Sequence, residues 1–187
     1  MPRRKEEDDR RRGGVQSLIE YPLSDADIRR VLGNDIPILT YPELEDLHSI
    51  DDCFDRKGRC ILLFLTESET AGHWCCMMKK KDGIYFWDPY GEAPEEQKDG
   101  IPKSRLEQLD MDEPFLTRLM RGSGRPIYYN SHQYQTDRRG INTCGRWCIA
   151  RLLYAPKSEE YFRKAVKSSG LPPDEFVVGL TANWLKK

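Results

Sequence analysis

Three apolar segments separated by short polar turns constrain this chain most strongly. The segment from Arg59 to Thr66 is a nearly continuous apolar run, typical of a central strand that is buried on both faces. Two further segments, Gly72 to Lys80 and Ile84 to Asp88, follow it, and Asp82-Gly83 between them is a strong hairpin signal. The three segments therefore predict an antiparallel meander at the centre of the fold.

Helical patterns flank this meander on both sides. Ser24 is a candidate N-cap with Asp27 three residues on, and the apolar stripe that follows predicts a helix ending at Gly33. Further patterns predict helices over 42–47, 112–121, 144–154, 158–168 and 174–185 and a short strand over 126–130. The predicted fold class is therefore α+β, with a central, mainly antiparallel sheet flanked by helices.

Length and charge predict one domain preceded by a tail. The chain has 187 residues, 38% of them apolar, and its 30 Lys and Arg against 31 Asp and Glu disfavour a globally basic nucleic-acid binder. Residues 1–14 carry six basic and four acidic side chains and predict a disordered charged tail before a single domain over 15–187. This tail is either a solvated terminus or a basic arm that contacts nucleic acid or a partner. Without an apolar segment long enough for a membrane span or a signal peptide, we expect a soluble intracellular protein with no membrane contact.

Cysteine spacing argues against a metal centre. The chain has six cysteines, and an intracellular setting favours free thiols over disulfides. Neither a CxxC pair nor an HxxxH spacing occurs, so we expect no metal and no cofactor. A four-ligand set of His73, Cys75, Cys144 and Cys148 stays open as an alternative.

A histidine and an aspartate lie on neighbouring strands of the predicted meander. Pairing of these strands can bring His73 close to Asp88, and an Asp that is bonded to one imidazole nitrogen fixes the tautomer and supports the imidazolium. The alternative is that Asp88 only begins a turn before Pro89. His132 competes as the base, and we favour His73 because a strand is the more rigid mount.

A cysteine stands at the predicted start of a helix. Backbone N–H groups and the helix dipole lower the pKa of a thiol at the position of Cys144, and Gly145 lets a substrate backbone approach closely. Gln135 and Gln133, nine and eleven residues earlier, are candidates for donating an amide N–H to an oxyanion. The alternative is an ordinary buried cysteine, a role that Cys148 fits better.

The order of these motifs resembles a known family of enzymes. The sequence resembles the adenain-like cysteine proteases in the order of four motifs. These are His73-Trp74, the segment from Asp88 to Gly91 after two aromatic residues, a Gln, and Cys144-Gly145. That family includes the adenovirus maturation protease and the SUMO-specific proteases. The segment from Phe86 to Pro94 is most similar to the viral branch, and Pro22 to Ile28 resembles proteases of virophages.

The resemblance covers about residues 60 to 155 and departs from the family at one point. The family places its Gln six or seven residues before the Cys. Gln135 is nine residues before Cys144, which implies an insertion around residues 138–140. The choice between Gln135 and Gln133 therefore stays open.

The resemblance implies a papain-like fold in permuted chain order and hydrolysis of peptide bonds without a metal. The implied roles are nucleophile for Cys144, base and acid for His73, orienting carboxylate for Asp88, oxyanion donor for Gln135, and roof of the substrate channel for Trp74. With Gly145, Trp74 completes the residues expected to bind substrate.

The viral resemblance also implies partners and a location. The substrates would be capsid and core precursor proteins, cleaved at glycine-containing sites during virion maturation. The enzyme would act in the host cytoplasm or viral factory and be packaged in the virion. Because the adenovirus enzyme uses DNA as a cofactor, residues 1–12 are expected to contact DNA weakly. The alternatives are a ubiquitin- or SUMO-directed isopeptidase and a catalytically inactive relative that only binds a partner.

Overall fold

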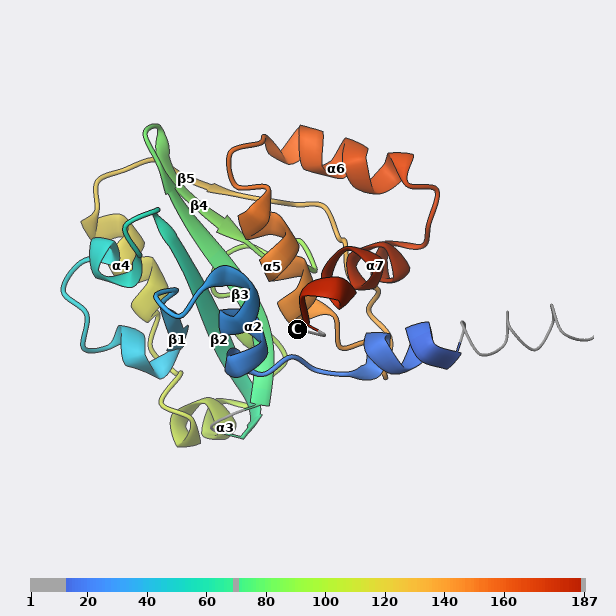
Figure 1. The fold of residues 1–187 in the computed structure, drawn as a ribbon. Helices are drawn as coiled ribbons and strands as arrows, with labels where there is room; N and C mark the ends of the chain where they lie inside the picture. The colour runs from blue at the N-terminus through green and yellow to red at the C-terminus, as the bar shows by residue number, and fades with distance from the viewer. Residues whose placement is uncertain (1–12, 69–70, 186–187) are drawn as a thin grey trace, which may run out of the picture.

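A five-stranded sheet in the order β1-β2-β3-β4-β5 forms the centre of the computed structural model, which describes residues 13–68 and 71–185 (Figure 1). The three central strands are β2 (Arg59–Ser68), β3 (Ala71–Lys80) and β4 (Gly83–Trp87). Each pairs antiparallel with the next, so the predicted meander is confirmed. The two edge strands, β1 (Ile38–Thr40) and β5 (Ile127–Tyr129), run parallel to β2 and β4.

The α+β class is confirmed, but the expectation of a mainly antiparallel sheet is wrong because the sheet is mixed. Long connections join each edge strand to its neighbour in the sheet. Residues 41–58 lead from β1 to β2, and residues 88–126 lead from β4 to β5. Parallel pairing requires such crossovers, whereas a tight turn can join only antiparallel neighbours. With three residues each, the edge strands are too short for an apolar pattern that indicates their direction.

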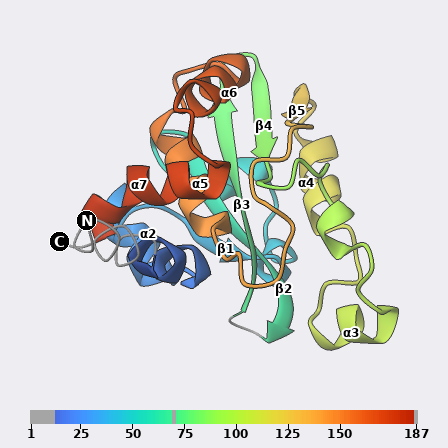
Figure 2. The same cartoon turned by 90° about the vertical axis from the view of Figure 1, so that its right-hand side faces the viewer.

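Helices cover both faces of the sheet (Figures 1 and 2). The helices are α2 (Asp25–Leu32), α3 (Lys103–Gln108), α4 (Phe115–Gly122), α5 (Cys144–Leu153), α6 (Glu159–Ser168) and α7 (Pro173–Leu185), with 3-10 helices η1 (Pro42–Leu44), η2 (Ile50–Cys53) and η3 (Glu96–Lys98). The two views place α2, α5, α6 and α7 on one face of the sheet and α4 on the other. Among the described residues, none of the helices combines the length and the apolar character that a bilayer crossing requires.

The first helix after the N-terminal segment has the predicted cap. Ser24 Oγ accepts a hydrogen bond from the Asp27 N–H at 3.2 Å, and Asp27 Oδ2 accepts one from the Ser24 N–H at 3.1 Å. The Tyr21 hydroxyl donates to the same Asp27 oxygen at 3.1 Å. These bonds satisfy donors at the helix end and fix the direction in which the chain enters α2.

A helical segment, residues 13–20, begins the described part of the chain and includes the last two residues of the predicted tail. Ile19 of this segment packs against Ile141 and Val178, and its carbonyl accepts a hydrogen bond from the Asn142 N–H at 2.9 Å. Because these contacts join residues far apart in the sequence, no local sequence pattern indicates that this segment packs on the domain. The rest of the predicted tail and its expected DNA contact, residues 1–12, lie outside the described residues.

Helix α5 is enclosed by the rest of the fold. Its residues from Cys144 to Leu152 are all buried, and it contacts β3, α7 and α2. A helix that is buried on every side is held by several neighbours at once. Its N-terminal residue, Cys144, therefore has a fixed position against β3.

Replacing Ser24 tests the cap of α2. Ser24→Ala should lower the free energy of unfolding by about 1 kcal/mol, because the Asp27 N–H loses its acceptor. For a chain of this size the melting temperature should fall by about 2–4 °C. Ser17→Ala, at an exposed site on the helical segment 13–20, is the control and should change the stability by less than about 0.5 kcal/mol. Equal effects of the two substitutions in thermal denaturation would contradict the assigned cap.

Candidate active site

The imidazole of His73 meets the carboxylate of Asp88 where β3 and the end of β4 lie side by side. His73 Nε2 and Asp88 Oδ2 are 3.1 Å apart. The Asp88 side chain is fully buried, whereas 13% of the His73 side chain is exposed. The predicted pair therefore forms, and its histidine faces the open side of the site.

Several donors surround the buried carboxylate. Asp88 Oδ2 also accepts hydrogen bonds from Cys75 Sγ at 3.1 Å and Gln97 Nε2 at 2.8 Å, and Oδ1 accepts one from the Tyr90 N–H at 2.5 Å. Burial acts to raise the pKa of Asp88, but the hydrogen bond and charge of His73, with these donors, lower it below its ordinary value. Asp88 is therefore ionised and holds the His73 ring in one orientation.

A buried asparagine fixes the backbone that carries this carboxylate. Asn130 Nδ2 donates to the Asp88 carbonyl at 2.7 Å, and Asn130 Oδ1 accepts from the Asp88 N–H at 2.9 Å. Nothing in the sequence singled out Asn130 or Gln97. Their roles depend on partners that are 42 and 9 residues away, so a short motif could not reveal them.

Cys144 lies at the N-terminus of α5, where His73 acts on the charge state of its thiol. Burial acts to raise the pKa of this thiol, but the hydrogen bond and charge of His73 and the N–H groups of Trp74 and Gly145 lower it below its ordinary value. Burial likewise acts to lower the pKa of His73, and bonds with Asp88 and Cys144 raise it. Both shifts favour a thiolate beside an imidazolium.

Tyr90 connects this pair to the predicted oxyanion donor. The Tyr90 ring stacks on His73 with centroids 4.8 Å apart, and its hydroxyl accepts a hydrogen bond from Gln135 Nε2 at 2.9 Å. Gln135 Nε2 also donates to the Ile141 carbonyl at 3.1 Å, while Gln135 Oε1 is buried and has no hydrogen-bond partner among the described residues. Burial and the charges of Cys144 and nearby carboxylates raise the pKa of Tyr90, so its hydroxyl stays neutral.

Gln133 and His132, the alternatives for the oxyanion donor and the base, lie on the surface of the protein. Gln133 is exposed and donates to the Gln135 carbonyl at 2.9 Å. His132 is also exposed, and its ring packs edge-on against Tyr134 with centroids 4.7 Å apart. The residue that lowers the pKa of Cys144 is His73, and His132 is not among the groups that shift it most.

One buried carboxylate ties the Cys144 and Gln135 segments together. Asp174, at the start of α7, accepts hydrogen bonds from Thr143 Oγ1 at 2.5 Å and from the Thr136 N–H at 3.2 Å. Thr143 directly precedes Cys144, and Thr136 directly follows Gln135. Asp174 therefore couples the position of Cys144 to that of the candidate oxyanion donor.

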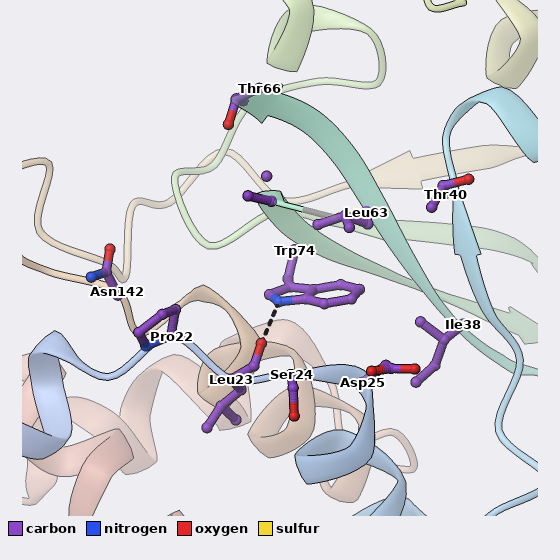
Figure 3. A pocket seen from close by; sticks show the side chains of 12 residues that line it. Pro22, Leu23, Ser24, Asp25, Ile38, Thr40, Leu63, Thr66, Trp74 and Asn142 are labelled. Atoms are coloured by element: carbon purple, nitrogen blue, oxygen red, sulfur yellow. Dashed lines mark hydrogen bonds between the residues drawn. The ribbon is translucent and has the colours of Figure 1, made fainter. Parts of the chain in front are cut away.

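The predicted substrate-binding residues pack against the N-terminal segment. Trp74 Nε1 donates to the Leu23 carbonyl at 3.0 Å (Figure 3). A Cβ added to Gly145 would lie 3.1 Å from Leu23 Cβ and 3.2 Å from Trp74 Cδ1, so only glycine fits here without a shift of its neighbours. Gly145 thus allows Leu23 and Trp74 to approach α5 closely.

Among the described residues, one group of side chains could hold a metal ion. It consists of His73, Cys75 and Asp88, whose potential ligand atoms lie within 4.8 Å of one another. In this structure each takes part in the hydrogen bonds of the carboxylate. The alternative ligand set also required Cys148, but Cys148 Sγ donates to the Trp74 carbonyl at 3.2 Å. Cys148 therefore has the structural role that its position in the sequence suggested.

Comparison with known proteins places the chain beside a virophage protein. It is 35% identical over 164 residues to the uncharacterized protein V9 of Sputnik virophage, and the match covers 85% of this chain and 93% of V9. No family model matches the chain. The central domain of the uncharacterized protein Lpg1148 from Legionella pneumophila shares 14% identity over 89% of this chain and 99% of its own, and its TM-score of 0.38 supports no argument.

The reactivity of Cys144 tests the thiolate–imidazolium pair. The thiolate–imidazolium pair is present at pH values above the pKa of the Cys144 thiol and below the pKa of His73. The first pKa is lowered from 9.0, and the second is raised from 6.5 to about 10. Iodoacetamide should therefore alkylate Cys144 rapidly at neutral pH and slow only as the pH falls through the lowered thiol pKa. In His73→Ala the midpoint should move above 9.0, because burial remains and the imidazolium is lost.

Peptide mass spectrometry gives the alkylation rate at each cysteine. Cys53 is the internal control, because burial raises its pKa to about 12 and it should stay unmodified in the native protein. An unchanged midpoint in His73→Ala would show that His73 does not activate the thiol.

Proposed function

The chain belongs to one family with protein V9 of Sputnik virophage, and we propose that it is a cysteine endopeptidase whose nucleophile is Cys144. One observation carries the proposal: a single imidazole, His73, hydrogen-bonds to a buried carboxylate and lowers the pKa of the Cys144 thiol at a helix N-terminus. This arrangement provides a nucleophile, a proton carrier and an orienting group, as thiol hydrolases require.

The proposed reaction has two stages. The Cys144 thiolate attacks the carbonyl carbon of the scissile peptide bond, and the carbonyl electrons move to oxygen. As the tetrahedral intermediate collapses, the C–N bond breaks and the His73 imidazolium gives its proton to the leaving amine. His73 then takes a proton from water, the hydroxide attacks the thioester, and Cys144 leaves as a thiolate. Asp88 keeps the ring in place in both stages.

The oxyanion would be bound by the Cys144 N–H and by Gln135. In the free protein Gln135 Nε2 already donates to Tyr90 and Ile141. Substrate binding would therefore exchange one of these two bonds for a bond to the oxyanion. Because the Tyr90 hydroxyl can both accept and donate a hydrogen bond, it is the partner that can rearrange at the lower cost.

The proposed fold family and substrates follow from the residue order and the virophage relation. In the proposed papain-like fold in permuted order, the nucleophile helix packs on the strand that carries the histidine, as α5 does on β3. We assign capsid and core precursor proteins as substrates, cleaved at glycine-containing sites during virion maturation. The enzyme would act in the host cell and be packaged in the virion.

Loss of the Cys144 thiol tests the proposal. Recombinant protein should generate new N-termini in a viral protein extract, and Cys144→Ala should lower their formation by at least about 10³-fold, because the acyl-enzyme cannot form. The matched control is Cys53→Ala, which also removes a buried thiol and should lose about 1–2 kcal/mol of stability but keep its activity. Mass spectrometry of labelled N-termini gives both cleavage rates and cleavage sites.

The outcomes separate the alternatives. Equal cleavage by Cys144→Ala and the unmodified protein would end the proposal. Labelling by a ubiquitin-family vinyl sulfone, without cleavage of viral precursors, would assign the protein to the isopeptidases. A protein that neither cleaves nor reacts with a thiol probe would be an inactive relative.

The two glutamines differ in their expected contribution. Gln135→Ala should lower kcat by about 10²–10³-fold with little change in KM, because the oxyanion forms only in the transition state. Gln133→Ala, which changes an exposed side chain on the same loop, should have a much smaller effect. Steady-state kinetics on a cleaved peptide compares them, and the reverse ranking would assign the oxyanion to Gln133.

A further inference from the structure

A groove of about 780 Å³ lies beside the candidate active site (Figure 3). The N-terminal segment and the start of α2 form one wall, and β1, β2 and β3 form the other. Leu23, Asp25, Ile38, Leu63, Trp74 and Asn142 are among the lining residues. Its volume is within the range of sites that bind ligands.

One end of the groove adjoins the catalytic residues. Gly72 and Trp74 precede and follow His73 on β3, and Asn142 is two residues before Cys144. Trp74 is held in place by its bond to Leu23. Trp74 Cδ1 would lie 3.2 Å from a Cβ on Gly145, the residue after Cys144, so the groove reaches the N-terminus of α5 and a chain bound at Cys144 would continue into it.

The opposite end of the groove is acidic. Figure 3 shows Asp25, Ile38 and Thr40 at this end, with Trp74 between them and Asn142. Asp25 is the one charged residue of the lining, and within residues 13–68 and 71–185 its carboxylate has no ion-pair partner. A second carboxylate, Glu43, lies at the same end, because its Oε2 accepts from Thr40 N–H at 2.6 Å and Thr40 Oγ1 at 2.9 Å.

We infer that the groove binds an extended segment of the protein substrate next to the scissile bond and selects a Lys or Arg side chain in it. This inference rests on the proposed peptidase function. The carboxylates of Asp25 and Glu43 would attract the cationic head, while Ile38 and Leu63 contact its aliphatic stem. A substrate segment with an acidic side chain at the same position would be repelled.

Peptide binding to Cys144→Ala tests the groove without catalysis. The probes are fluorescent octapeptides of alanine that end in Gly-Gly, with one Lys, Ala or Glu placed at each position in turn. At one position Lys should bind about three- to tenfold more tightly than Glu, and the preference should shrink at high salt, as expected for exposed charges. Fluorescence anisotropy measures the Kd values.

Charge reversal identifies the carboxylate that acts. In the Cys144→Ala background, Asp25→Lys should reverse the preference at that position, so that Glu binds better than Lys. The control is Asp112→Lys, the same change at an exposed site just before α4, which should leave the preference as it was. Circular dichroism checks that each variant is folded.

The results separate this inference from the proposed function. Equal binding of Lys and Glu peptides at all positions, or an unchanged preference in Asp25→Lys, would overturn the inference even if the unmodified protein cleaves peptides. A Lys preference that Asp25→Lys reverses would support it even if no peptide is cleaved. In that case the peptidase function alone would fail.

Discussion

The buried carboxylate of Asp88 is the constraint on which the candidate site depends. An ionised carboxylate without partners in the protein interior costs several kcal/mol, so its oxygens must be satisfied by donors. These donors come from β3, from the loop after β4 and from η3, while Asn130 fixes the backbone. The requirement draws distant segments to one point. The orientation of His73, and through it the charge state of Cys144, follows from this arrangement.

Local patterns predicted the parts of the fold whose signals are local. The apolar runs and Asp82-Gly83 indicated the three central strands, and Ser24 with Asp27 indicated the cap of α2. The direction of β1 and β5 could not be predicted in the same way. Each has three residues and pairs with a strand that the chain reaches only after a long connection, so tertiary packing decides its orientation.

The same distinction applies to the site. His73, Asp88 and Cys144 could be predicted because each belongs to a short motif and the motifs occur in a recognisable order. Gln97, Asn130 and Asp174 could not be predicted, because their functions come from partners elsewhere in the chain. Gly145 was expected to admit a substrate backbone. In the structure its missing side chain makes room for Leu23 and Trp74, a packing role that the adjacent residues in sequence do not reveal.

The anchoring of two segments of the candidate site by Asp174 has a consequence for synthesis. A ribosome makes the chain from the N-terminus, so His73, Asp88 and Cys144 leave the exit tunnel before α7 does. Until residues 173–185 have emerged, Thr143 and Thr136 lack their shared acceptor, and the segments of Cys144 and Gln135 are not held together. A nascent chain therefore carries an incomplete candidate site until α7 has been made.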